Sequence, residues 1–198
     1  VAERAVAAEI ADYIIAEGRA TVDFVIVASG PNGASAHHEV SDRVLQLGDP
    51  VVVDIGGTMP SGYCSDCTRT YSIGAPPEEF LEAYAALRSA QSAAVHHAKV
   101  GVSAESVDTA ARSILTDAGL GAAFVHRTGH GIGLDTHEEP YIVSGNTHLL
   151  EAGNAFSIEP GFYLPGKFGA RIEDIVVVTD SETIRCNNES HDLVIAGV

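Results

Sequence analysis

Basic side chains are scarce in this sequence. Its 198 residues include 11 Lys and Arg against 27 Asp and Glu, which gives a formal net charge of −16. A protein that binds the phosphate backbone of a nucleic acid needs a basic surface that displaces counterions, and so few cations cannot supply one. We therefore expect no nucleic-acid partner, and an acidic, solvated surface.

Cysteines and long apolar runs are also few. Three cysteines, Cys64, Cys67 and Cys186, do not make a disulfide framework, and we predict that all three are reduced packing residues. Cys64 and Cys67 form a C-x-x-C, but residues three apart in a strand point to opposite faces, and no second pair completes a zinc site. No stretch has the length of a membrane helix and no signal segment is visible, so we expect no membrane association and a cytoplasmic location.

The rest of the composition is that of a globular domain. Hydrophobic residues make up 45% of the chain and charged residues 19%, and the length suits one domain with a sizeable core. A helical pattern is already under way at Val1, without a preceding Met, so we expect a fragment of a longer protein. Periodicity and capping predict helices over 1–18, 76–99 and 103–119, strands over 23–29, 50–56 and 63–72, and a glycine-rich loop over 29–36.

Two similar hairpins each carry a pair of acids. VVVDIGG and SDCTRT contain Asp54 and Asp66, and FSIEPGFYLPG and ARIEDIVVV contain Glu159 and Glu173. Each half has a helix before its acidic strands, which predicts an internally duplicated α+β fold with a curved antiparallel sheet backed by helices. Four carboxylates in half-buried strands repel one another unless positive charge lies between them, so the pattern favours a pair of metal ions and metal-assisted hydrolysis.

Strand alternation predicts which neighbours of these acids face the site. Arg171 shares a face with Glu173 and should reach the same cavity, either as a partner of a ligand or as an anchor for a substrate carboxylate. Asp174 points the other way, and we expect it to face solvent or to support a ligand.

A histidine-rich glycine segment, HRTGHGIGLDTHEEP, lies between the two hairpins. Its glycines make a helix improbable. In an extended strand His126 and His130 share one face, and the glycines would let the backbone approach a ligand or metal closely. His37 is ambiguous by pattern alone. We interpret the remaining histidines as bystanders on surfaces or loop edges: His38, His96, His97, His148 and His191.

Together these runs resemble the pita-bread metallopeptidases, most closely their Xaa-Pro branch, prolidase and aminopeptidase P. The resemblance covers nearly the whole chain. It implies the α+β, pseudo-symmetric pita-bread fold, with residues 1–198 as the catalytic domain and without the N-terminal domain that this branch usually carries. It also allows a homodimer.

The resemblance implies the roles of the site residues. Two divalent metal ions would be bound, with Asp66 and Glu173 bridging them and Asp54, His130 and Glu159 completing the ligand set. His137 would steady the tetrahedral intermediate, and His37, His126 and Arg171 would be further active-site residues. Such an oxygen-rich ligand set favours Mn²⁺, and also suits Co²⁺, Zn²⁺ or Fe²⁺.

The implied reaction is hydrolysis of Xaa-Pro bonds in short proline-containing peptides. A hydroxide that bridges the metals would attack the carbonyl, and Glu159 would pass a proton to the leaving nitrogen. The enzymatic alternative is a methionine aminopeptidase, which shares the five ligands but not the HRTGHG sequence. Creatinase-like hydrolysis without metals and a metal-free peptide- or protein-binding module are less consistent with an intact ligand set.

Overall fold

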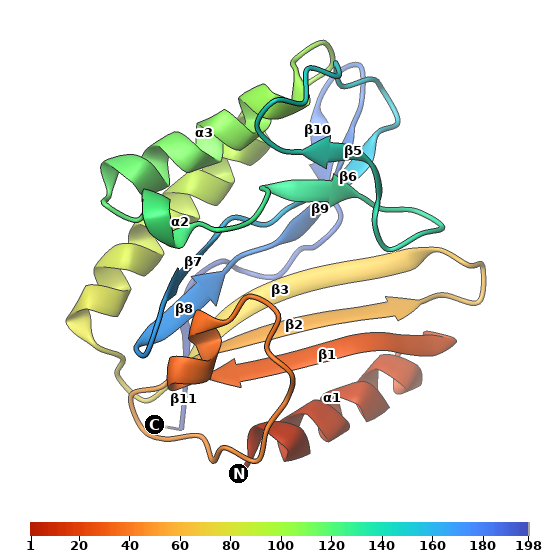
Figure 1. The fold of residues 1–198 in the computed structure, drawn as a ribbon. Helices are drawn as coiled ribbons and strands as arrows, with labels where there is room; N and C mark the ends of the chain where they lie inside the picture. The colour runs from red at the N-terminus through yellow and green to blue at the C-terminus, as the bar shows by residue number, and fades with distance from the viewer. Residues whose placement is uncertain (198) are drawn as a thin grey trace.

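The computed structural model describes residues 1–197 and has an α+β fold (Figure 1). The N-terminal part contains α1 (Glu3–Ala16), β1 (Thr21–Ser29), the 3₁₀ helix η1 (Gly30–Ala34), β2 (Pro50–Thr58) and β3 (Cys64–Ile73). The C-terminal part contains α2 (Glu78–His97), α3 (Ala104–Asp117), the 3₁₀ helix η2 (Gly121–Ala123), β4 (Gly129–Gly131), β5 (Glu138–Ile142), β6 (Ala155–Ile158), β7 (Gly161–Leu164), β8 (Phe168–Arg171), β9 (Asp174–Val178), β10 (Thr183–Arg185) and β11 (Val194–Ala196). The three predicted α-helices are confirmed, whereas much of the predicted 29–36 loop is a 3₁₀ helix.

One sheet, in the order β1-β2-β3-β11, carries the first pair of acids. Its strands β1, β2 and β3 are antiparallel neighbours, and α1 lies along β1, as Figure 1 shows. A small core forms where Ala7 of α1 meets Val27 and Val51. The sheet was predicted to be antiparallel throughout, but β11 runs parallel to β3, because the chain crosses to this edge after β10 in the other sheet.

A second sheet, in the order β10-β9-β6-β4-β5, carries the histidine segment. The long helices α2 and α3 cover this half of the molecule in Figure 1. Here lies the main core, in which Phe80 and Leu87 of α2 and Leu115 of α3 pack with Phe156 and Ile172, all fully buried. Because the helices bury one side of this half, the polar side chains of its strands gather on the other side, toward the first sheet.

The predicted second acidic hairpin is interrupted at both of its acids. β6 pairs with β9, whereas β7 and β8 form a separate two-stranded hairpin. Pro160 has no N–H for a ladder, and it separates β6 from β7. Glu159 and Glu173 therefore lie between strands, at the points where the chain leaves and rejoins the sheet. The expectation that Glu173 lies within a strand was wrong for this reason.

The cysteines of residues 1–197 are free thiols. Cys64 and Cys67 are half-buried, but Cys186 is exposed, so the prediction that all three pack in the interior was wrong for Cys186. It follows β10, which is the edge strand of its sheet. Across the same residues, none of the α-helices combines the length and the hydrophobicity that a membrane crossing requires.

Candidate active site

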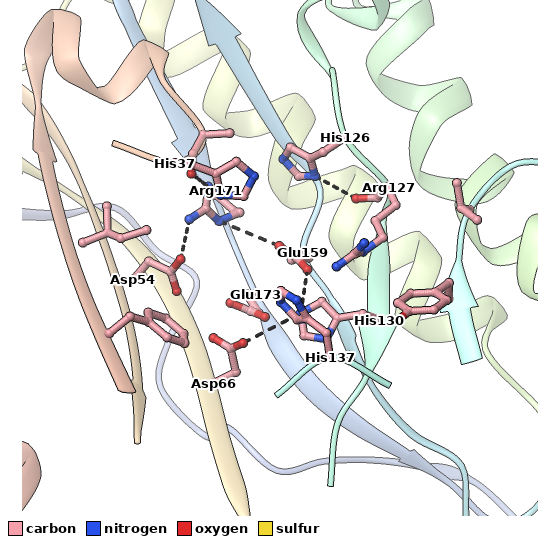
Figure 2. A pocket seen from close by; sticks show the side chains of 15 residues that line it. His37, Asp54, Asp66, His126, Arg127, His130, His137, Glu159, Arg171 and Glu173 are labelled. Carbon is pink, nitrogen blue, oxygen red and sulfur yellow. Dashed lines mark hydrogen bonds and ion pairs between the residues drawn. The ribbon is translucent and has the colours of Figure 1, made fainter. Parts of the chain in front are cut away.

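A cavity of about 770 Å³ lies where the two halves of the molecule meet. Asp54 and Asp66 enter it from β2 and β3, and His130 enters from β4 (Figure 2). Phe24 and Tyr141 form part of its apolar wall. Every site residue predicted from the sequence lines this one cavity: His37, Asp54, Asp66, His126, His130, His137, Glu159, Arg171 and Glu173.

Three of the predicted metal ligands converge most closely. One possible ligand atom each of Asp66, His130 and Glu173 lies within 4.8 Å of the other two, and all three side chains are buried. The His130 Nε2 atom is 3.8 Å from the Asp66 Oδ2 atom and 3.2 Å from the Glu159 Oε1 atom. The carboxylates of both halves thus meet around a single imidazole.

The tautomer of His130 suits a metal ligand. Its Nδ1 atom lies 3.0 Å from the carbonyl oxygen of Gly131, and because a carbonyl only accepts, Nδ1 carries the proton. The Nε2 atom, which faces the carboxylates, is then the ring nitrogen that is available to a metal ion. A backbone carbonyl that fixes the tautomer in this way is typical of metal-binding histidines.

The glycines beside His130 lie close to the backbone of neighbouring strands. A Cβ atom on Gly129 would lie 1.8 Å from the Ser157 carbonyl oxygen. One on Gly131 would likewise collide with the Glu139 carbonyl oxygen. The glycines therefore let β4 fit between β5 and β6. They allow the close approach of neighbouring strands.

The protein groups around the four acids do not supply enough positive charge to balance them. Burial, and then the negative charges of Asp54 and Glu159, raise the pKa of Asp66 to about 8. Burial, and then Asp66, raise the pKa of Glu173 well above its usual value. Among residues 1–197, the buried Asp54 Oδ1 and Glu173 Oε1 atoms have no hydrogen-bond donor. Hard oxygen atoms without donors beside an imidazole nitrogen fit divalent cations.

Glu159 differs from the other acids. Burial alone would raise its pKa, but the hydrogen bond with His130 and the charge of Arg171 lower the pKa to about 2. The Ser157 hydroxyl also donates to the Glu159 Oε1 atom at 3.0 Å. Glu159 is therefore ionised at neutral pH and can accept a proton.

The Arg171 guanidinium forms hydrogen bonds with other side chains of the protein. Its guanidinium donates to the Asp54 Oδ2 atom at 2.6 Å, to the Tyr163 hydroxyl at 2.7 Å and to the Thr68 hydroxyl at 3.1 Å. The Arg171 side chain does reach the cavity, as predicted. Of the two roles considered for it, these contacts favour orienting Asp54 over binding a substrate carboxylate.

A hydrogen-bonded chain connects Arg171 to His126 through Tyr163. The Tyr163 oxygen lies 2.8 Å from the His126 Nε2 atom, and the His126 Nδ1–H group donates to the Arg127 carbonyl oxygen at 2.7 Å. Burial lowers the pKa of His126, so the ring is neutral at pH 7 and its Nε2 atom accepts from the tyrosine. This chain holds His126 in the cavity wall.

Three hydroxyl groups in this site had no predicted role: those of Tyr163, Ser157 and Thr68, of which strand alternation places only Thr68 beside a predicted ligand, on the face of Asp66. The Thr68 hydroxyl donates to the Glu173 Oε2 atom at 2.8 Å. Ser157 lies two residues from Glu159, as Thr68 does from Asp66, so the same alternation could have identified Ser157. Tyr163 gave no such signal, because its partners come from distant segments.

His137 and His37 differ from the buried residues, because both side chains are exposed at the cavity. The His137 ring lies 4.1 Å from the His130 ring, centroid to centroid, in an edge arrangement. Desolvation, and then the neighbouring His130, lower the pKa of His137, so it is neutral at pH 7. A neutral imidazole in this position still has an N–H group to donate into the cavity.

Three residues interpreted as bystanders or as solvent-facing have structural roles. Asp174 is fully buried; it forms an ion pair with Arg69 at 2.8 Å and lies 2.9 Å from the His191 Nε2 atom. His38 lies 3.0 Å from the buried Glu3 carboxylate. Sequence patterns missed these contacts because each partner lies far away in the chain.

Carboxylate oxygens without hydrogen-bond donors, gathered between two sheets of an α+β fold, are typical of a metal-dependent hydrolase. Residues 1–180 match the sequence model of metallopeptidase family M24, and the chain belongs to that family. It is 58% identical to the probable dipeptidase PepE of Mycobacterium tuberculosis, over 99% of this chain and 52% of the relative. It is also 45% identical to the Xaa-Pro dipeptidase of Lactobacillus delbrueckii subsp. lactis, over 90% of this chain and 49% of the relative.

Solved structures agree with this assignment. The crystal structure of dipeptidase PepE from Mycobacterium ulcerans superimposes with a TM-score of 0.96 at 61% identity, over 98% of this chain and 52% of that one. Recombinant prolidase from Thermococcus sibiricus gives a TM-score of 0.95 at 48% identity, over 98% and 53%. The predicted pita-bread fold is confirmed. The chain spans about half the length of the curated relatives that it matches.

Proposed function

We propose that residues 1–198 are the catalytic domain of an Xaa-Pro dipeptidase that uses two divalent metal ions. The observation that carries the proposal is the convergence of Asp66, His130 and Glu173 in a peptide-sized cavity, with carboxylate oxygens that lack donors. The names of the relatives, dipeptidase and Xaa-Pro dipeptidase, support the substrate class.

Asp54, Asp66, His130, Glu159 and Glu173 would hold the metal ions, with Mn²⁺ as our first choice. When bound, such ions lower the pKa of a coordinated water and polarise a carbonyl oxygen. Arg171 keeps the Asp54 carboxylate turned toward the cavity, and Thr68 does the same for Glu173. The ligand set is therefore preorganised by neutral and cationic donors around it.

The other residues of the cavity can move or hold protons. Glu159 is ionised, so it can accept a proton and then pass it to the imino nitrogen of the leaving proline. His137 can donate its N–H group to the oxyanion that develops on the scissile carbonyl. His126 and His37 line the same space and would contact the substrate.

Arg127 is our candidate for the group that binds the free carboxylate of a dipeptide. Its guanidinium lines the cavity and lies 5.0 Å from the centre of the Tyr141 ring. Within residues 1–197 it forms no ion pair, in contrast to Arg171. A guanidinium that faces a peptide cavity without an acidic partner is suited to a carboxylate. This arrangement favours dipeptides over longer peptides.

The alternatives fit less well. A methionine aminopeptidase has no use for an arginine that binds a carboxylate next to the scissile residue, and the curated relatives named above are not of that kind. A metal-free binding module would have no need of four acids placed so that they repel one another.

The proposal predicts selective hydrolysis of Xaa-Pro dipeptides. After loading with Mn²⁺, the protein should cleave Ala-Pro and leave Met-Ala-Ser uncleaved, and excess EDTA should abolish the activity. Chromatography measures the release of free proline from Ala-Pro and of free methionine from Met-Ala-Ser. Cleavage of Met-Ala-Ser in preference to Ala-Pro would instead indicate a methionine aminopeptidase.

The same assay tests Arg127. In Arg127→Ala, KM for Ala-Pro should rise about tenfold to a hundredfold, which is the value of one charge-assisted hydrogen-bonding group. KM for Ala-Pro-amide, which has no carboxylate, should change little. Equal effects on the acid and the amide would show that Arg127 does not bind the carboxylate.

A further inference from the structure

The segment that follows β10 crosses the seam between the two sheets, directly behind the predicted metal ligands. It begins at Cys186, whose N–H group donates to the Ile175 carbonyl oxygen at 2.8 Å and so continues the β10–β9 pairing by one residue. It ends in β11, which pairs with β3 in the other sheet. The family match stops at residue 180, so it assigns this segment no role.

Asn187 uses both ends of its side-chain amide within this segment. Its Oδ1 atom accepts from the Ile175 N–H group at 2.6 Å, and its Nδ2 atom donates to the Asp66 carbonyl oxygen at 3.1 Å. One rigid amide thus joins β9 to β3. Ile175 is two residues from Glu173, and Asp66 is itself a predicted ligand.

The position of this contact matters because, within residues 1–197, β3 has no strand partner on that edge near Asp66. Its neighbour β11 pairs only with Tyr71, Ser72 and Ile73. Further along the same edge, the Thr68 carbonyl oxygen accepts from the Glu173 N–H group at 3.1 Å. Asn187 therefore supplies a hydrogen bond between the sheets at the point where no backbone ladder can.

Other contacts hold the segment in place without Asn187. The Arg69 Nη2 atom donates to the Glu189 carbonyl oxygen at 3.0 Å, and the Tyr84 hydroxyl donates to the His191 carbonyl oxygen at 3.1 Å. His191 also pairs with the buried Asp174. Removing the Asn187 amide should leave the segment docked and remove only its link between the two ligand backbones.

We propose that Asn187 is a positioning residue of the metal site, which fixes the spacing of Asp66 and Glu173 by tying their strands together. The inference rests on the proposed metal-dependent function. Buried carboxylates that repel one another tend to move apart, and a tie between their backbones keeps them ready for the ions. Groups that orient ligands in this way contribute about tenfold to a hundredfold to metal affinity.

The test is a Mn²⁺ titration of the whole chain by isothermal titration calorimetry. Asn187→Ala should bind Mn²⁺ about tenfold to a hundredfold more weakly than the unaltered chain. The matched control is Asn188→Ala, because Asn188 is the adjacent, exposed asparagine, and its affinity should change by less than about twofold. Electron paramagnetic resonance of the loaded proteins gives a second readout, because the coupling between two Mn²⁺ ions depends on their separation and should change in Asn187→Ala alone.

A second variant tests the inference if Asn187→Ala does not fold. Asn187→Asp keeps the acceptor for Ile175 but places an oxygen against the Asp66 carbonyl, so it should also weaken Mn²⁺ binding. Circular dichroism of the metal-free proteins establishes folding. Unchanged affinity and coupling in a folded Asn187 variant, or equal losses in Asn188→Ala, would overturn the inference while leaving the metal site intact. A complete lack of Mn²⁺ binding by the unaltered chain would overturn the proposed function and the inference together.

Discussion

Alanine in place of Asp66 or Glu173 should lower kcat/KM for Ala-Pro by about a thousandfold or more. The reason is that each side chain is predicted to contact both metal ions, and loss of metal-based stabilisation of several kcal/mol corresponds to such a factor. The measurement is the rate of proline release with Mn²⁺ in excess. Asp117→Ala, which removes an exposed acid at the end of α3, should retain full activity.

Removal of one of these carboxyl groups should raise the stability of the metal-free protein, although it lowers activity. Asp66→Asn replaces a carboxyl group that the folded state must keep protonated at neutral pH, because burial and then Asp54 raise its pKa to about 8, with an amide that carries no such cost. The metal-free Asn variant should therefore melt a few degrees higher than the metal-free parent, although it is inactive. Thermal unfolding in EDTA measures this difference. Retained peptidase activity, or a lower melting temperature in EDTA, would contradict the role given to Asp66.

Stability of the metal-free protein should fall as the pH rises from about 7 to about 8. In this interval the folded state holds protons on Asp66 and Glu173 that the unfolded chain has already lost, since an unfolded carboxyl titrates near pH 4. The free energy of unfolding decreases with pH wherever the folded state binds more protons. The slope approaches about 1.4 kcal/mol per pH unit for each such proton.

The shifted pKa values of Glu159, His126 and His137 affect stability mainly outside the interval from pH 7 to pH 8. Glu159, with a pKa lowered to about 2, contributes stability that is lost only under acidic conditions. His126 and His137, whose pKa values are lowered by burial, contribute stability that is lost as the pH falls below about 6.5, where an unfolded histidine gains its proton. Urea unfolding in EDTA at pH 7.0, 7.5 and 8.0 provides the measurement.

Bound Mn²⁺ should reverse the decrease of stability with rising pH. Mn²⁺ binds the ionised carboxylates, so it should stabilise the protein more at pH 8 than at pH 7. Asp66→Asn should show a shallower decline in EDTA, because one of the titrating groups is gone. A metal-free stability that is flat or that rises between pH 7 and pH 8 would mean that these acids do not repel one another in the folded protein.

Patterns within short segments predicted the helices and the set of acids. The apolar spacing of α2 and α3 and the glycines that end the predicted helices depend only on neighbouring residues. The four acids were identifiable because a carboxylate in an apolar run is costly unless it has a partner. The repetition of that cost in two hairpins indicated a shared site, and the cavity contains all four side chains.

Such patterns could not predict contacts between segments that are distant in the sequence. Tyr163 bonds to His126, 37 residues away, and Asn187 bonds to Asp66, 121 residues away. Both contacts depend on which strands pair, and that depends on the interruption of the second hairpin at Pro160 and Glu173. The burial of Asp174, which the sequence left open, has the same origin, because its partners Arg69 and His191 come from other segments.

The most direct test of the metal site is a crystal structure of the Mn²⁺-loaded protein, with anomalous diffraction recorded at the manganese absorption edge. Two anomalous peaks should lie in the cavity, both in contact with Asp66 and Glu173, one with Asp54 and the other with His130 and Glu159. An empty cavity, or manganese bound only at exposed acids elsewhere, would contradict the account.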